Sequence, residues 1–89
     1  MNREVTLVTR AGCHLCDTAG ETVAAVAAQY EFELVVLDVD SSPDLLAKYG
    51  DHVPVVLVDG SLVAYWFVTS EVLAKALAEG PESISVPPL

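Results

Sequence analysis

The first half of the chain alternates between short apolar runs and one long amphipathic stretch. Residues 4–9, EVTLVT, are rich in β-branched side chains and predict a strand, which Gly12 ends. From Cys13 to Gln29, apolar side chains recur at three- and four-residue steps, the spacing of a helix with one buried face. Residues 33–39, ELVVLDV, form an almost continuous apolar run, as expected of a strand covered on both faces. This half therefore predicts a β-α-β unit with parallel strands and a right-handed crossover.

The middle of the chain predicts a short helix and then a hairpin. Ser42 can cap a helix whose first position is Pro43, and Gly50 can end it. Two apolar runs then flank the pair Asp59-Gly60, and this dipeptide between apolar runs is a strong hairpin signal. The hairpin would add two antiparallel strands to the sheet.

The C-terminal part predicts one more helix and then a tail. Residues 69–80, TSEVLAKALAEG, have helical apolar spacing, which turns four side chains inward: Val72, Leu73, Ala76 and Leu77. Residues 81–89 contain three prolines and predict a flexible tail without fixed structure. We therefore expect one α/β domain over residues 1–80, with the order β-α-β-α-β-β-α and a mixed four-stranded sheet flanked by helices on both faces.

Composition and charge exclude several classes of protein. The 89 residues suffice for one domain, and 53% hydrophobic against 19% charged residues is too apolar for a disordered chain. Four basic and thirteen acidic residues give a net charge of −9, which argues against nucleic acid and against anionic membrane surfaces. The longest apolar run, residues 62–68, is far shorter than the roughly 20 residues of a membrane span. The N-terminus lacks the layout of a signal peptide, so we expect a cytoplasmic protein. We also expect it to be a monomer.

Both cysteines of the chain lie in the motif Cys13-His14-Leu15-Cys16, at the start of the first predicted helix. The unpartnered N–H groups and the dipole of a helix N-terminus stabilise a thiolate, which is the nucleophilic form of cysteine. Cys16 lies one turn further along, on the apolar stripe, so we expect it to be the more buried and less acidic thiol. This asymmetry suits exchange, in which Cys13 attacks a disulfide and Cys16 then resolves the mixed disulfide.

Two other interpretations of the cysteine pair stay open. The C-x-x-C spacing also occurs in metal sites, but a structural zinc needs four ligands. The chain offers only Cys13, Cys16, His14 and the distant His52, so we expect no bound metal. The cysteines could also be an inert buried pair.

Three positions near the cysteines are candidates for contacts with a substrate. Arg10, three residues before Cys13, can hold the thiolate or a substrate carboxylate through its guanidinium. His14 can stabilise the thiolate when protonated, or can equally be an exposed residue of the first helical turn. A cis bond between Val53 and Pro54 would place the backbone of Val53 beside the cysteines, where an extended substrate can pair with it.

Together these features resemble the glutaredoxin-like proteins of the thioredoxin superfamily. The resemblance covers residues 4–79 and rests on TRAGCHLC after the first strand and on HVPVVLVDG at the hairpin. More closely, the chain resembles short bacterial glutaredoxin-like proteins with a C-x-L-C site, a YGDxVPV stretch and a YW in the last strand. The resemblance implies a thioredoxin-like fold, redox activity and no bound cofactor.

The resemblance also implies a role for each matching position. Cys13 matches the nucleophilic cysteine, and Cys16 matches the resolving one. Pro54 matches the cis-proline, Val53 the residue whose backbone meets the substrate, and Arg10 the basic residue that helps to hold glutathione. The full set of predicted substrate-binding residues is Arg10, His14, Leu15, Val53 and Pro54.

Two departures from the family pattern bear on the electron donor. Glutaredoxins usually have proline and tyrosine between the cysteines, where this chain has His14-Leu15, so the redox potential cannot be transferred. They also have two glycines before the last helix, where residues 67–71 read FVTSE, so close approach of glutathione is sterically harder. We expect electrons from glutathione, another low-molecular-weight thiol or a thioredoxin reductase. The expected partners are that reductase and disulfide-containing proteins or small disulfides.

The leading hypothesis is a thiol–disulfide oxidoreductase that exchanges two electrons through Cys13 and Cys16. The alternative is a redox sensor or adaptor, whose disulfide switches the binding of a partner without turnover. Its binding surface would include three consecutive aromatic residues, Tyr65, Trp66 and Phe67. Strand alternation sends Trp66 to the opposite face from the other two, so we expect these rings to pack in the core under the helices.

Overall fold

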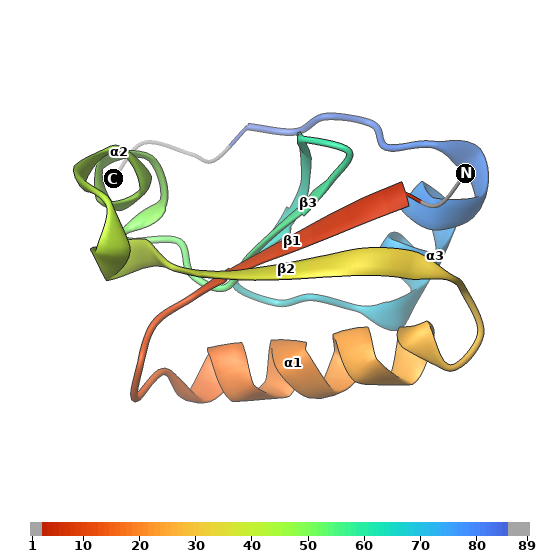
Figure 1. Ribbon diagram of the computed structural model, residues 1–89, viewed down its shortest axis with the longest axis horizontal. Helices are drawn as coiled ribbons and strands as arrows, with labels where there is room; N and C mark the ends of the chain where they lie inside the picture. The colour runs from red at the N-terminus through yellow and green to blue at the C-terminus, as the bar shows by residue number, and fades with distance from the viewer. Residues whose placement is uncertain (1–2, 86–89) are drawn as a thin grey trace.

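The computed structural model describes residues 3–85 and has the predicted order of elements (Figure 1). The elements are β1 (Arg3–Thr9), α1 (His14–Ala27), β2 (Phe32–Asp38), the short 3-10 helix η1 (Val39–Ser41), α2 (Pro43–Tyr49), β3 (Val55–Val58), β4 (Ser61–Tyr65) and α3 (Ser70–Glu79). The start and stop signals of α2 are confirmed, because Ser42 accepts a hydrogen bond from the Leu45 N–H and Gly50 is the C-cap. Within residues 3–85, no helix is long and apolar enough to cross a membrane.

The four strands form one mixed sheet in the order β2-β1-β3-β4. β1 and β2 are parallel, as the predicted β-α-β unit requires, and β3 and β4 form the antiparallel hairpin. α1 and α3 cover one face of the sheet, and α2 packs on the other. Figure 1 shows α2 at the end of the sheet where β1 leads into α1. The predicted α/β class and the mixed four-stranded sheet with helices on both faces are confirmed.

Alternate side chains of β1 divide the core into two clusters. Val5 and Leu7 contact the helices α1 and α3, whereas Val8 faces α2. The buried helical residues that meet Val5 and Leu7 are Ala19, Val23, Val26, Leu73, Ala76 and Leu77. Because both faces of β1 are packed, the chain that leaves its C-terminal end starts from a fixed position.

β2 is an edge strand, and the prediction that residues 33–39 are covered on both faces was wrong. Leu34, Val35 and Val36 are between 37% and 58% exposed, and none belongs to a core cluster. The reason is the strand order, since β2 pairs only with β1 and is an edge of the sheet. The strand also ends one residue early, at Asp38, whose carboxylate accepts a hydrogen bond from the Asp40 N–H and caps η1.

The last strand and the last helix differ from prediction in two details. β4 ends at Tyr65 because Trp66 has a left-handed backbone, with φ of 59°, which interrupts the alternation of side chains. Trp66 therefore belongs to neither core cluster and Phe67 is 72% exposed, whereas Tyr65 packs against the cluster that includes α2, as predicted. In α3 three of the four predicted side chains are buried, but Val72 is 42% exposed.

Part of the tail predicted for residues 81–89 is hydrogen-bonded to the sheet. The backbone N–H of Ile84 donates to the carbonyl of Leu62 at 2.9 Å. β4 is the second edge of the sheet, so this bond satisfies a carbonyl that has no neighbouring strand. Residues 86–89, the rest of the predicted tail, lie outside the described residues.

The hairpin turn is fastened to the start of β1 by one carboxylate. Asp59 and Gly60 both have positive φ, as a tight hairpin turn requires. The Asp59 carboxylate accepts hydrogen bonds from the Glu4 backbone N–H at 3.0 Å and from Arg3 Nη1 at 2.8 Å. These two hydrogen bonds hold the pKa of Asp59 below its ordinary value, and the bond from the Glu4 N–H has the larger effect.

Replacing Asp59 with asparagine is therefore expected to lower stability at neutral pH, with a difference that disappears in acid. Asparagine tolerates the left-handed backbone, so the substitution mainly removes the charge. Because the folded pKa is depressed, the carboxylate stabilises the fold above its ordinary value of 3.8 and loses this effect as the pH falls through the folded value. Urea denaturation over this pH range measures the difference. The control is Glu21→Gln on the exposed side of α1, and an equal pH dependence in both variants would contradict the prediction.

Candidate functional site

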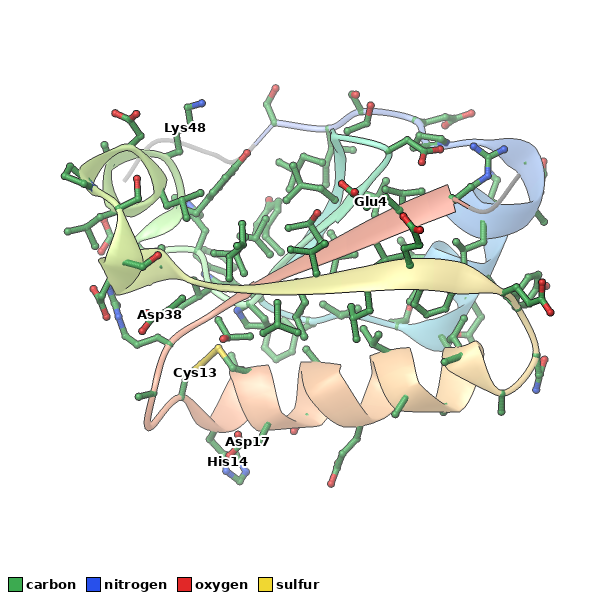
Figure 2. The ribbon with its side chains drawn as sticks, viewed as in Figure 1. Glu4, Cys13, His14, Asp17, Asp38 and Lys48 are labelled. Carbon is green, nitrogen blue, oxygen red and sulfur yellow. A yellow bond between two sulfur atoms is a disulfide. The ribbon has the colours of Figure 1, made fainter. Side chains whose placement is uncertain are left out.

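The motif with both cysteines lies where β1 leads into α1. A tight turn connects the two elements, in which the Cys13 N–H donates to the Arg10 carbonyl at 3.3 Å. Gly12 adopts φ of 75° in this turn, a conformation that favours glycine. Cys13 then has extended backbone angles and is the N-cap of α1. Figure 2 shows the cysteine pair between the first turn of α1 and the end of the sheet.

Cys13 and Cys16 form a disulfide, with their Cα atoms 5.2 Å apart. The Sγ of Cys13 also accepts a hydrogen bond from the Cys16 backbone N–H at 3.1 Å, one of the N–H groups that a helix leaves without a partner in its first turn. Cys16 is only 4% exposed, whereas Cys13 is partly accessible. The predicted difference in burial between the two cysteines is confirmed. An incoming sulfur can thus reach Cys13 more easily than Cys16.

The segment before β3 lies at the same end of the sheet. The bond between Val53 and Pro54 is cis, as the family resemblance implied, and Pro54 is fully buried. β1 and β3 pair Val8 with Val55, so the residues that precede Val55 continue alongside the residues that follow Val8 and lead to Cys13. The role of Val53 as a backbone partner for the substrate stays a prediction.

The guanidinium of Arg10 is bonded to other parts of the protein. Nε and Nη2 donate to the two carboxylate oxygens of Asp40, at 3.0 and 3.1 Å, and Nη1 donates to the Gly50 carbonyl at 3.0 Å. Arg10 thus ties the turn before Cys13 to η1 and to the end of α2. Its hydrogen bonds hold the pKa of Asp40 below its ordinary value. The predicted role of Arg10 in holding a thiolate or a substrate carboxylate remains untested, and the side chain already has a carboxylate partner.

The two residues between the cysteines differ in exposure. His14 is exposed, and Figure 2 shows it on the outer side of α1, beside Asp17 and away from the sheet. Leu15 is partly buried. The exposed position of His14 matches the simpler of its two interpretations, a solvated residue of the first turn. Contacts of either residue with a substrate stay a prediction.

An aromatic cluster of His52, Tyr65 and Trp66 holds the segment that contains the cis-proline. The Trp66 ring stacks on His52, with centroids 5.4 Å apart and planes inclined by 15°, and Tyr65 meets both rings edge-on. The Trp66 indole N–H donates to the Asp51 carbonyl at 3.0 Å, and its backbone N–H donates to the Pro54 carbonyl at 2.9 Å. The end of β4 is therefore bonded to both ends of residues 51–54.

The metal hypothesis required Cys13, Cys16 and His14 to come together. In the part of the chain that the structure describes, no three side chains of His, Cys, Asp or Glu are grouped so that they could hold a metal ion. His52, the fourth possible ligand, is buried against the rings of Tyr65 and Trp66.

Comparison with known proteins places the chain in a family. The family model of the glutaredoxin-like domain (DUF836) matches residues 4–78. The chain belongs to this glutaredoxin-like family. The uncharacterized proteins Mb0520 of Mycobacterium bovis and Rv0508 of Mycobacterium tuberculosis are each 38% identical to it over 80 residues, a region that covers 84% of this chain and 82% of each relative.

Solved structures agree with this assignment of the glutaredoxin-like domain. The solution structure of protein Ne2328 from Nitrosomonas europaea aligns with a TM-score of 0.78 and 28% identity, covering 88% of this chain and 94% of that one. A thioredoxin variant from Halobacterium salinarum aligns with a TM-score of 0.67 and 20% identity, covering 93% of this chain and 78% of that one. The second likeness concerns the fold alone, which is thioredoxin-like. A thioredoxin fold with a disulfide at Cys13 and Cys16 suggests a redox function.

Two features of this glutaredoxin-like domain were not predicted from its sequence: the pairing of Asp40 with Arg10 and the packing of His52 against Tyr65 and Trp66. A signal for Asp40 was present, because β1 and β2 were predicted to be parallel. Neighbouring parallel strands end at the same edge of a sheet. Asp40, which follows β2, is therefore expected to lie near Arg10, which follows β1. The aromatic cluster had no comparable signal, since its geometry depends on the left-handed backbone of Trp66.

Proposed function

We propose that this glutaredoxin-like protein is a thiol–disulfide oxidoreductase that exchanges two electrons through Cys13 and Cys16. The observation that carries the proposal is the disulfide at the N-cap of α1, with one accessible and one buried sulfur. The accessible sulfur of Cys13 can react with a substrate disulfide, and the buried sulfur of Cys16 can then attack the mixed disulfide that forms. Proteins that use a disulfide only as a structural link do not need this difference in access.

The proposed reaction has two exchange steps. In the reduced protein the Cys13 thiolate attacks one sulfur of a substrate disulfide, R–S–S–R′, so that the mixed disulfide Cys13–S–S–R forms and R′–S⁻ leaves. Cys16 then loses its proton and attacks the Cys13 sulfur, which forms the Cys13–Cys16 disulfide and releases R–S⁻. The two released thiolates take up protons. The protein loses two electrons and the substrate gains them.

The backbone around Cys13 supports the first step. The Cys16 N–H that donates to the Cys13 Sγ would also donate to a thiolate there, and hydrogen bonds to a charged acceptor are stronger than those to a neutral one. The positive end of the α1 dipole acts in the same direction. Both effects favour the form of Cys13 that attacks.

A donor of two electrons must return the disulfide to the dithiol. We propose either two molecules of a low-molecular-weight thiol, glutathione or another, or one dithiol of a thioredoxin reductase, and either donor is oxidised to a disulfide in the exchange. Because the two sulfurs carry the electrons themselves, the reaction needs no bound cofactor. The proposed substrates are the disulfides of proteins or of small molecules.

A redox titration tests whether the pair works in the range of known redoxins. The protein is equilibrated in buffers of defined thiol–disulfide ratio, and its free thiols are trapped and counted by mass. We expect a reversible two-electron transition with a midpoint between about −270 and −180 mV, the span from thioredoxins to protein disulfide isomerase. A pair that stays oxidised in strongly reducing buffer, or that never closes, would overturn the proposed function.

A further inference from the structure

Arg10 and Asp40 form a closed ion pair next to the redox-active turn. Nε and Nη2, which form a fork of the guanidinium, donate to the two carboxylate oxygens of Asp40, at 3.0 and 3.1 Å. The third nitrogen, Nη1, donates to the Gly50 carbonyl. A substrate carboxylate would bind to arginine through the same fork, because this bidentate geometry is the strongest that the two groups offer. In this protein an internal carboxylate already occupies that position.

Two further carboxylates lie near the same guanidinium. The pKa of Arg10 is raised first by its hydrogen bonds to Asp40 and then by the negative charges of Asp40, Asp51 and Asp38. Asp38 is at the level of Thr9, as the pairing of β1 with β2 shows, and Asp51 starts the segment that leads to the cis-proline. We call Asp38, Asp40 and Asp51 the carboxylate rim. One cation against three carboxylates leaves this side of the site negative.

We propose that Asp40 is a specificity-determining residue, which withholds Arg10 from substrate carboxylates so that the site selects neutral and cationic disulfides over anionic ones. The inference rests on the oxidoreductase function proposed above. Without Asp40, the Arg10 side chain would offer a fork to an anion only three residues before Cys13. With Asp40 in place, the charge of Arg10 is neutralised by its own partner. An anionic disulfide then meets the negative charges of the carboxylate rim. The substrate class is therefore disulfides whose flanking groups are uncharged or basic.

Three small disulfides of similar size provide the probes. These are 2-hydroxyethyl disulfide, which is neutral, cystamine, which is cationic, and 3,3′-dithiodipropionate, which is anionic. Reduced protein is mixed with each in a single turnover, so that the two electrons come only from Cys13 and Cys16 and each probe leaves as two thiols. Each rate is divided by the rate of dithiothreitol with the same probe, which cancels the different reactivities of the leaving thiols.

We expect the normalised rate of the wild type to be lowest with the anionic probe. Asp40→Asn keeps the shape of the side chain and removes its charge, so it should raise the rate with the anionic probe about threefold to tenfold and change the neutral rate little. The matched control is Glu33→Gln, an exposed carboxylate near the start of β2, which changes the net charge equally. The double variant Arg10→Gln with Asp40→Asn should lose the gain, because the freed cation is then absent.

Several results would overturn the role of Asp40. These are an equal gain in Glu33→Gln, a gain that survives in the double variant, or a wild type that reduces the anionic and neutral probes equally well. If Asp40→Asn does not fold, the wild type alone still tests the charge effect, because added salt should bring its anionic rate toward the neutral one. An anionic-to-neutral ratio that does not change with salt would also contradict the inference. Failure of the proposed function looks different, since the reduced wild type would then react with no probe faster than dithiothreitol does.

Discussion

Replacing Cys13 with serine is expected to lower the rate of disulfide reduction about a thousandfold or more. A serine hydroxyl is not ionised near neutral pH and is a weak nucleophile without a general base, so the first exchange step cannot begin. Replacing Cys16 with serine should have a different effect, because Cys13 can still attack while nothing resolves the mixed disulfide. The two variants thus separate the two sulfurs, whose burial already differs in the structure.

Intact mass after mixing with 2-hydroxyethyl disulfide measures both outcomes. The Cys16→Ser variant should carry one mixed-disulfide adduct, and the Cys13→Ser variant should carry almost none on the same timescale, because its remaining thiol is buried. Glu21→Gln, an exposed substitution on the same helix, is the control and should react like the wild type. Unchanged reduction by Cys13→Ser would exclude the proposed mechanism. Slow turnover of the wild type with every donor, together with a partner that binds only the oxidised form, would instead favour the redox sensor.

Local chemistry in the sequence was sufficient to predict the order of elements. Ser42 and Pro43 start α2 and Gly50 ends it, and Asp59-Gly60 makes the hairpin turn, because caps and tight turns depend on a few adjacent residues. The cysteine pair was predictable for the same reason. Its position at the N-cap and its difference in burial follow from the end of a strand, a glycine and the apolar stripe of the helix that begins there.

The errors concern features that depend on residues far apart in the chain. The apolar run of β2 indicates a strand, but its exposure follows from the order of strands in the sheet, which places β2 at an edge. The partner of Arg10 is 30 positions away, and the two meet only because β1 and β2 run side by side. The residues around Cys13 therefore contain no signal that the carboxylate of Asp40 pairs with Arg10.

Trp66 is a third case, because alternation along a strand assumes ordinary backbone angles. A left-handed residue is unusual for a bulky side chain, so nothing in the local sequence indicates that β4 ends at Tyr65. Once the backbone turns there, the Trp66 ring leaves the sheet and stacks on His52 instead. The surrounding contacts keep the backbone in this conformation, since both backbone and indole N–H groups are hydrogen-bonded.

Replacing Trp66 with alanine is expected to lower the free energy of unfolding by about 2–3 kcal/mol and to weaken substrate binding. The loss combines the ring contacts with His52 and Tyr65 and the hydrogen bond from the indole N–H to the Asp51 carbonyl. Trp66→Phe keeps a ring but not the donor, so we expect a smaller cost of about 1 kcal/mol. Urea denaturation followed by far-UV circular dichroism measures both, because Trp66 is the only tryptophan and its fluorescence is lost in the variants.

The effect of Trp66 on catalysis follows from the segment that it holds. Trp66 donates hydrogen bonds to the carbonyls of Asp51, His52 and Pro54, which lie in the segment that contains Val53 and the cis bond. A looser segment would present its backbone to the substrate less often. For a protein disulfide we therefore expect KM to rise in Trp66→Ala by a larger factor than kcat falls, while the redox midpoint of the cysteine pair stays the same. Phe67→Ala is the matched control, because that neighbouring ring is 72% exposed and belongs to neither core cluster. Equal stability and equal KM in the two alanine variants would show that the aromatic cluster does not position the site.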